Sequence, residues 1–382
     1  MTSLMKILFS APDVDLSTEH GGATHVDELA KAAVSLGHDV ALVCSRKKLD
    51  LEHVTIFNLP QFENSIFRLL TRFMWPFFIT LYLSFSNNLN IVWERGRIFG
   101  GGAVLAAWLV RKLAIYEMIE PYEKLFQISS TPNMLKKLVL FWHNFVVRLA
   151  SIVICTHPIF YNGAPEKFKI VHTGANPKKF FPYNRSRDIL RKVNIKKGKV
   201  VLYIGSFIPW HALEKTILAA KEVYAADKTI RFLLIGKGEK YDYCKNLVCD
   251  LKLKNVIFVG NVSYNEIPDY INVADVCLAL FDRTHAHIAN FDYFYSPIKV
   301  HEYKACGKPI VASNIGTLKE LVKNGVNGLL VDEQNLSEIA NAILALIKNK
   351  KLAQKIGTKN REEIKTVYNW ESIVNSVLSN VK

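Results

Sequence analysis

The chain has 382 residues, of which half are hydrophobic and 22% are charged, so it can bury two or three sizeable cores and is not disordered. Its net charge of +15 favours polyanionic partners such as nucleic acid, anionic lipid or phosphorylated substrates. No zinc-finger, RNP-type or helix-turn-helix pattern accompanies this charge, so nucleic acid is not expected as a partner. The six cysteines include no CxxC pair, which favours a reduced, cytoplasmic chain.

Short apolar runs alternate with helical patterns through the first half of the chain. A helix is expected from about Thr24 to Leu36, after a loop that reaches Gly21 and Gly22. Strands are expected at residues 6–10, 39–44, 91–93, 114–117, 152–155 and 170–172. This alternation predicts a parallel sheet that is covered by helices on both faces.

The second half repeats this pattern more clearly. Strands are expected at residues 200–204, 231–235, 256–259, 276–280, 309–312 and 328–331. Most of these runs are bounded by glycine, as in buried parallel strands. Residues 174–199 have the composition of a linker, so we predict one domain over residues 1–182, a second over 183–360 and a closing helical segment over 361–382.

One segment complicates the expectation of an ordinary soluble domain. Residues 73–85 form a run of 13 residues without a charge, and Arg68 and Arg72 precede it. The run is shorter than the ~20 apolar residues that a spanning helix needs, and Pro76 interrupts it. Two interpretations stay open: a helix buried in the core, or an interfacial helix through which residues 66–85 contact an anionic membrane.

The segment from Ser296 to Glu302 combines several groups with useful chemistry. Ser296 is a predicted N-cap and Pro297 a predicted first helical residue, so the amides of residues 298–300 would face outward and favour an anion. Lys299 and Glu302 are three residues apart and share a helix face. An ammonium beside those amides suits a diphosphate, and a carboxylate one turn deeper suits two sugar hydroxyls. The alternative is an ordinary capped helix with a surface Lys–Glu pair.

Together these pieces resemble a GT-B-fold glycosyltransferase of the retaining family 4 group, over nearly the whole chain. The motifs that carry the resemblance are Gly21-Gly22, Gly37-His38-Asp39-Val40 and residues 171–176, 202–207, 274–276, 296–312, 324–331 and 370–371. The resemblance implies two doubly wound Rossmann-like domains that face a cleft, with the C-terminal helix crossing back to the first domain. It also implies that the acceptor binds mostly to the first domain and the nucleotide-sugar donor to the second.

The sequence departs from the family pattern at two places. The family motif is a Glu, seven residues and a second Glu; Glu302 matches the second, which holds the donor ribose, but Phe294 stands at the first, which lies near the donor hexose. Ser206 stands where the family usually has an Arg, and His211 is near the position of a family Lys. We expect Lys299 to supply the missing charge for the phosphates.

The remaining candidates lie where strands are expected to end. The donor-binding candidates are Gly21, Gly22, Gly205, Ser206, Gly236, Gly238, Val262, Tyr295, Ser296, Pro297, Ile298, Lys299, Val300 and Glu302. The candidates for catalysis are Lys299, Glu302, His211 and Glu117. Glu117, or the nearby Glu120, could orient the acceptor hydroxyl. Plain turn chemistry is an equal alternative for the glycines, and packing on Trp210 is the alternative for His211.

The resemblance implies transfer of a sugar, with retention, from a nucleotide-diphosphate sugar to a lipid-linked or polysaccharide acceptor, as in polysaccharide biosynthesis at the inner face of a membrane. No cofactor or metal is expected. A loop before the key helix holds a possible set of metal ligands, Asp282, His285, His287 and Asp292. A polar gating loop is the preferred interpretation of that set. Because Phe294 and Ser206 replace polar groups, the alternative function is a non-catalytic nucleotide-sugar-binding partner of another transferase.

Overall fold

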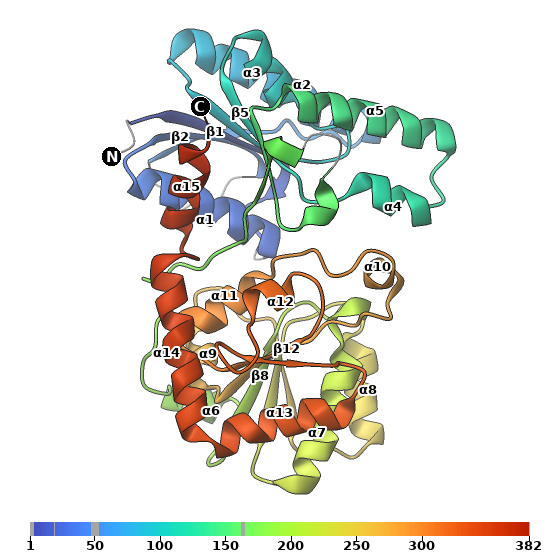
Figure 1. Ribbon diagram of the computed structural model, residues 1–382, viewed down its shortest axis with the longest axis vertical. Helices are drawn as coiled ribbons and strands as arrows, with labels where there is room; N and C mark the ends of the chain where they lie inside the picture. The colour runs from blue at the N-terminus through green and yellow to red at the C-terminus, as the bar shows by residue number, and fades with distance from the viewer. Residues whose placement is uncertain (1–3, 19, 47–52, 162–164, 382) are drawn as a thin grey trace. The chain divides into compact units, whose positions relative to one another are not determined.

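The structure is a computed structural model that describes residues 4–18, 20–46, 53–161 and 165–381. The chain forms two compact units (Figure 1). The first contains Met1–His172 together with Trp370–Lys382, and the second contains Thr173–Asn369. The last helix of the chain is therefore part of the first unit, as the resemblance implied.

The first unit is built on a seven-stranded parallel sheet of order β3-β2-β1-β4-β5-β6-β7. Its strands are β1 (Lys6–Asp15), β2 (Asp39–Arg46), β3 (Val54–Asn58), β4 (Ile91–Arg95), β5 (Leu113–Glu117), β6 (Ile152–Cys155) and β7 (Phe168–Ile170). The strand order reverses between β1 and β4. In doubly wound sheets, ligands gather at the carboxyl ends of the strands beside such a switch.

Helices cover both faces of this sheet. They are α1 (Gly21–Ser35), α2 (Ser65–Ser86), α3 (Gly102–Leu109), α4 (Tyr122–Ile128), α5 (Asn133–Leu149) and α15 (Trp370–Ser379), with short 3₁₀ turns at η1 (Pro158–Phe160) and η2 (Pro165–Lys167). Helix α15 packs on α1, where Trp370, Val374 and Val377 join one buried core with Ile7 and Phe9. Helices α2, α3 and α5 cover the other face (Figure 1).

The second unit has a six-stranded parallel sheet of order β10-β9-β8-β11-β12-β13. Its strands are β8 (Val200–Ile204), β9 (Arg231–Ile235), β10 (Val256–Gly260), β11 (Val276–Ala279), β12 (Ile310–Ser313) and β13 (Leu329–Val331). The order reverses between β8 and β11, so the loops after these two strands meet at the switch point.

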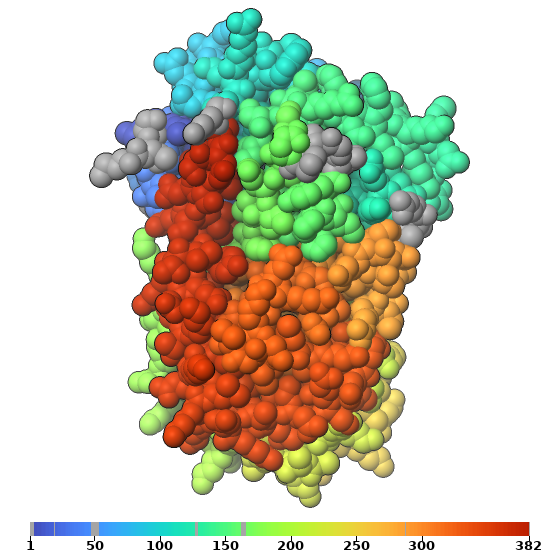
Figure 2. All heavy atoms as spheres, in the orientation of Figure 1, coloured from blue at the N-terminus to red at the C-terminus, as the bar shows by residue number. Residues whose placement is uncertain are grey.

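The helices of the second unit are α6 (Arg187–Lys192), η3 (Pro209–His211), α7 (Leu213–Ala226), α8 (Tyr241–Asp250), α9 (Ile267–Val273), α10 (Ala286–Ala289), α11 (Ile298–Ala305), α12 (Leu318–Leu321), α13 (Leu336–Lys348) and α14 (Lys350–Thr366). Helix α14 forms one edge of this unit's surface (Figure 2, red). It is held by the buried Lys304, whose Nζ lies 2.7 Å from Glu363 Oε2 and donates to Leu321 O at 2.6 Å.

The predicted fold class is confirmed: both halves are parallel sheets covered by helices, and the C-terminal helix returns to the first unit. Strand β3 was not predicted, and the strand expected at 170–172 lies instead at Phe168–Ile170. We predicted domain boundaries at 182/183 and 360/361. In the structure, Thr173 N donates to Ser296 Oγ and Ala175 N donates to Tyr368 O, both within the second unit.

Candidate functional site

The start of helix α11 differs in detail from the prediction. Pro297, not Ser296, is the residue that precedes the helix, with extended backbone (φ −74°, ψ 117°) and no side-chain cap. Ser296 was wrongly predicted as the N-cap, because its Oγ instead accepts from Thr173 N at 3.0 Å. Val300 N donates to Pro297 O at 3.0 Å, so the amides left at the helix start are those of Ile298 and Lys299.

Lys299 places a buried ammonium at this helix start. Its Nζ lies 4.4 Å from the ring centroid of Tyr203 and 5.1 Å from that of Phe281, and it has no hydrogen-bond partner among the described residues. Burial lowers the pKa of Lys299 to about 7, and the charge of Glu302 offsets only part of that effect. A buried ammonium without an acceptor is the arrangement expected of a site that receives an anion.

Glu302 lies one turn further along α11 and is 5% exposed. The next residue, Tyr303, accepts a hydrogen bond from Ile204 N through its hydroxyl at 2.9 Å, which ties α11 to the end of β8. Val300 is fully buried and points into the core of the second unit. Helix α11 thus presents Lys299 and Glu302 from a rigid support.

The loop after β8 carries Gly205, Ser206 and His211. A Cβ on Gly205 would lie 2.6 Å from Lys299 Nζ, so this glycine leaves the room that the lysine head occupies. His211 Nδ1 lies 2.7 Å from Ser206 O and 2.9 Å from Tyr203 Oη. Burial and the charge of Lys299 lower the pKa of His211 to about 3. His211 is therefore neutral at physiological pH, so a positive charge on this pair of side chains resides on Lys299.

Gly236 and Gly238 follow β9 with positive φ angles of +125° and +155°. A Cβ on Gly236 would lie 2.1 Å from Gly205 O, and one on Gly238 would lie 2.5 Å from Phe207 O. The close approach of the two loops therefore requires both glycines, whether or not a ligand is bound. Among the other candidates, Val262 and Tyr295 are partly buried against the core of the second unit.

Phe294, at the first position of the family motif, is 1% exposed, and its ring is tilted against that of Tyr295 with 4.4 Å between the ring centroids. The aromatic ring is part of the packing of this segment. Its side chain offers neither charge nor access to a donor sugar.

In the first unit, Gly21 and Gly22 form the first turn of α1, which His20 caps by accepting from Ala23 N through Nδ1 at 3.2 Å. The sequence placed these glycines before the helix; the structure places them inside it. A Cβ on Gly22 would lie 3.0 Å from Nη1 of Arg95. The Nε and Nη1 atoms of Arg95 are buried without a hydrogen-bond partner among the described residues. The glycine leaves space for this guanidinium.

Glu117 ends β5 and is held by two partners. Its Oε1 lies 2.7 Å from His25 Nε2, and its Oε2 accepts from Trp93 Nε1 at 3.2 Å. Burial raises the pKa of Glu117, but His25, Arg95 and the Trp93 bond outweigh it and bring the pKa to about 2. Glu117 is thus a permanent carboxylate that fixes the imidazole of His25. The predicted site residues did not include His20, His25 or Arg95; the position of His20 beside Gly21-Gly22 is the one local signal.

The other carboxylates at this edge have structural partners. Glu94 is fully buried and accepts from Gly101 N at 2.8 Å and from Val104 N at 2.9 Å, at the start of α3. Burial raises its pKa to about 7, against the effect of these bonds. Glu120 Oε1 lies 3.8 Å from Arg97, whose Nε lies 2.5 Å from Asp13 Oδ2.

The possible metal ligands before α11 do not assemble. No group of three or more described His, Cys, Asp and Glu side chains is placed to hold a metal ion. Asp282 lies 2.7 Å from Lys215 Nζ and accepts from Thr284 N at 2.9 Å, while the ring of His285 packs on Trp210. The side chain of His287 is outside the described part of the chain.

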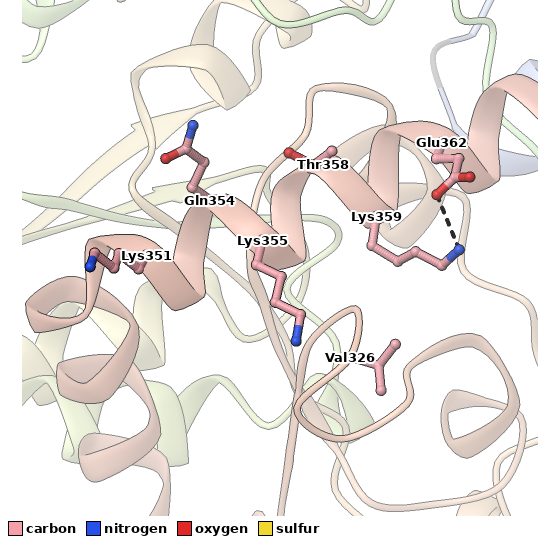
Figure 3. A pocket seen from close by; sticks show the side chains of 7 residues that line it. All are labelled: Val326, Lys351, Gln354, Lys355, Thr358, Lys359 and Glu362. Atoms are coloured by element: carbon pink, nitrogen blue, oxygen red, sulfur yellow. Dashed lines mark hydrogen bonds and ion pairs between the residues drawn. The ribbon is translucent and has the colours of Figure 1, made fainter.

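A surface hollow of about 550 Å³ lies elsewhere in the second unit, between α14 and the loop that carries Val326 (Figure 3). It is lined by Val326, Lys351, Gln354, Lys355, Thr358, Lys359 and Glu362. Lys359 pairs with Glu362 at 3.1 Å. The hollow contains none of the predicted site residues.

Comparison with known proteins finds relatives in sequence and in fold. Residues 186–363 match the family model described as Glycosyl transferases group 1. An uncharacterised glycosyltransferase of Methanocaldococcus jannaschii is 24% identical over 380 residues, which cover 98% of this chain and 97% of that protein. A GDP-mannose-dependent phosphatidylinositol monomannoside mannosyltransferase of Mycobacterium tuberculosis is 24% identical over 213 residues, 55% of this chain and 54% of that protein.

Two solved structures share the whole architecture. A glycosyltransferase from Rickettsia africae has a TM-score of 0.75 at 18% identity, over 99% of this chain and 98% of its own. Anabaena HepE, solved in complex with UDP and glucose, has a TM-score of 0.70 at 19% identity, over 98% of each chain. The two parallel sheets thus form a GT-B fold. Residues 186–363, just under half of the chain, match the glycosyl transferases group 1, and the chain is similar to a glycosyltransferase over nearly its whole length.

Proposed function

We propose that this enzyme transfers a sugar with retention, and without a metal, from a nucleotide-diphosphate sugar to a lipid-linked or polysaccharide acceptor. The observation that carries the donor assignment is the buried ammonium of Lys299, which has no hydrogen-bond partner among the described residues and lies at the switch point of the second sheet. HepE, whose fold this chain shares, was solved with UDP and glucose and with UDP-glucose.

The chemistry follows from where charge develops. Breaking the bond between the sugar and the diphosphate leaves negative charge on the nucleotide. Lys299 and the amides of Ile298 and Lys299 would stabilise that charge, and they are fixed in place before the reaction. Glu302 would accept hydrogen bonds from the ribose hydroxyls. Because Ser206 replaces the usual arginine, Lys299 carries the phosphate interaction here.

The acceptor assignment rests on the first unit. Glu117, His25 and Arg95 lie together at the carboxyl end of its sheet, where a doubly wound domain binds ligands. His25 is a candidate to contact the acceptor hydroxyl, with Glu117 as its positioning residue. A location at the cytoplasmic face of a membrane, with peripheral contact through residues 66–85, belongs to the same proposal.

The rival function, a non-catalytic donor-binding partner, is motivated by Phe294 and Ser206. Phe294 is packed within its own segment and cannot make the donor-sugar contact that a Glu would make at this position. The proposed phosphate and ribose contacts of Lys299 and Glu302 do not depend on it. Donor binding is therefore expected under both functions, and transfer separates them.

The test is a thermal-shift screen of UDP-, GDP- and other nucleotide sugars, followed by an assay of donor hydrolysis and transfer. A true donor at a hundred times its dissociation constant stabilises the folded protein by about 2.7 kcal/mol. Stabilisation together with donor turnover supports the transferase. Saturable binding without turnover across a broad acceptor panel supports the non-catalytic partner, and no stabilisation by any nucleotide sugar contradicts both.

A further inference from the structure

Helix α2 carries an apolar stripe on its outer face. Phe67, Leu70, Met74, Phe78, Tyr82 and Phe85 recur at spacings of three and four residues and are between 38% and 81% exposed. The inner face buries Pro76, Ile79 and Leu83. A helix that covers a core needs one apolar face, so the outer stripe of α2 is not explained by the fold.

Helix α5 repeats this arrangement. Met134, Leu138, Phe141 and Phe145 form its outer stripe, with exposed fractions from 37% to 85%. Its inner face buries Val139, His143, Val146 and Val147. Large apolar side chains at helical spacing are therefore exposed on both helices.

The two helices are neighbours. The rings of Phe73 in α2 and Trp142 in α5 meet edge to face at 5.5 Å, and Trp142 Nε1 donates to Gly100 O at 2.7 Å, just before α3. Trp108 and Leu109 at the end of α3 are both more than half exposed. Because this ring contact places α2 beside α5, we treat the two outer stripes together and call them the α2–α5 surface. Figure 1 shows α2, α3 and α5 in the same part of the first unit.

The charges on this surface have one sign. Neither helix contains an acidic residue, and their basic residues are Arg68, Arg72, Lys136, Lys137 and Arg148. Exposed aromatic and aliphatic side chains beside arginines and lysines are the composition of helices that lie in the headgroup layer of anionic membranes.

We propose that the α2–α5 surface docks on an anionic lipid bilayer, with its apolar stripes at the boundary between headgroups and acyl chains. The inference deepens the proposed membrane contact of residues 66–85 by adding α5, which the sequence did not indicate. It depends on the first unit alone and not on the donor site.

Two other arrangements fit less well. Helix α2 is long and apolar enough to cross a membrane, and 17% of its most apolar window is buried. However, a Cβ on Gly102 would lie 2.1 Å from Phe73 O, so α2 is closely packed on the start of α3 and would lose that packing on insertion. A two-fold dimer through this surface would bring basic side chains against basic side chains with no acid between them.

The test is co-flotation of the full chain with vesicles of phosphatidylcholine alone and with about 30% phosphatidylglycerol. Phe78→Ser removes an α2 side chain and Phe141→Ser an α5 side chain; Val367→Ser, at an equally exposed position in the second unit, is the control. The wild type and the control should bind anionic vesicles, and each Phe variant should bind at least about fivefold more weakly. Lys137→Glu should weaken binding to the anionic vesicles more than to the neutral ones.

Thermal unfolding of the exposed variants should match that of the wild type, which shows that they are folded. Normal binding by Phe141→Ser, with weak binding by Phe78→Ser, would overturn the role of α5. If the wild type does not bind the vesicles, the proposal is overturned. The same holds if it does not bind them and light scattering instead shows a concentration-dependent dimer. None of these measurements uses a nucleotide sugar, so their failure is distinct from failure of the proposed transferase.

Discussion

The Nζ atom of Lys299 occupies the space that a side chain at Gly205 would need: a Cβ on Gly205 would lie 2.6 Å from it. A residue at the end of β8 and a residue at the start of α11 are thus matched in shape and charge. The fit buries a cation beside two aromatic rings, and burial of a cation costs free energy until an anion arrives.

That cost predicts an unusual pH dependence of stability. The pKa of Lys299 is about 7 in the folded protein against an ordinary value of 10.5, so the unfolded chain binds more protons between these values. Stability from this residue therefore rises with pH across that window, by up to about 1.4 kcal/mol per pH unit. Urea unfolding should show that the unfolding free energy of the wild type, relative to that of Lys299→Met, is larger at about pH 9 than at about pH 7. An unchanged difference between the two proteins would contradict the buried, unpaired ammonium.

Removing the charge of Glu302 should weaken donor binding. A charge-assisted hydrogen bond to a ribose hydroxyl is worth about 1.5–3 kcal/mol, so Glu302→Gln should lower donor affinity about tenfold or more. Isothermal titration with the donor found by the screen measures this change. Glu362→Gln, which removes a carboxylate on the exposed face of α14, is the matched control and should bind normally. Unaltered affinity in Glu302→Gln would remove Glu302 from the donor site.

Two glycines allow steric and conformational costs to be separated. Gly236 and Gly325 both have positive φ, but a Cβ on Gly236 meets Gly205 O at 2.1 Å, whereas a Cβ on Gly325 meets nothing within 4 Å. Gly325→Ala should cost about 1 kcal/mol of unfolding free energy. Gly236→Ala should cost roughly 3 kcal/mol or more, because backbone must move. Chemical denaturation checks both values, and equal costs would mean that the two loops separate easily.

The pair of Glu117 and His25 predicts acid behaviour. The pKa of Glu117 is lowered from 4.5 to about 2, so its stabilising contribution is present above the first value and is lost as pH falls toward the second. That contribution amounts to at most about 3 kcal/mol. Glu117→Gln should lower stability at neutral pH and flatten the loss of stability on acidification. An acid-unfolding curve that keeps the wild-type shape would show that the ion pair contributes nothing.

Local patterns predicted much of the fold and part of the site. Strands β8 and β9 were predicted at their observed bounds because apolar runs end at glycine there. Strand β3 was not, because it is at the edge of its sheet and none of its residues is fully buried, which weakens the apolar signal. Lys299 and Glu302 share one helix, so their spacing was readable from the sequence.

Contacts between segments that are distant in the chain could not be predicted from the sequence. The N-cap prediction for Ser296 failed because Thr173 competes for its hydroxyl. His25 in α1 reaches Glu117 in β5 only through the packing of α1 on the sheet, and no local motif encodes that distance. Likewise, the apolar residues of α5 became interpretable only when their outward direction was known.

The return of α15 to the first unit has a consequence for synthesis. The first unit is translated first, but its core is complete only after the last segment of the chain has been made, because Trp370, Val374 and Val377 belong to that core. The ring of Trp370 also lies edge-on to His25 at 5.3 Å. A premature stop just after Asn369 would therefore yield a chain that contains the whole second unit but lacks α15. In that chain the apolar residues of the first unit that pack on α15 would be exposed, and His25 would lose its contact with the ring of Trp370.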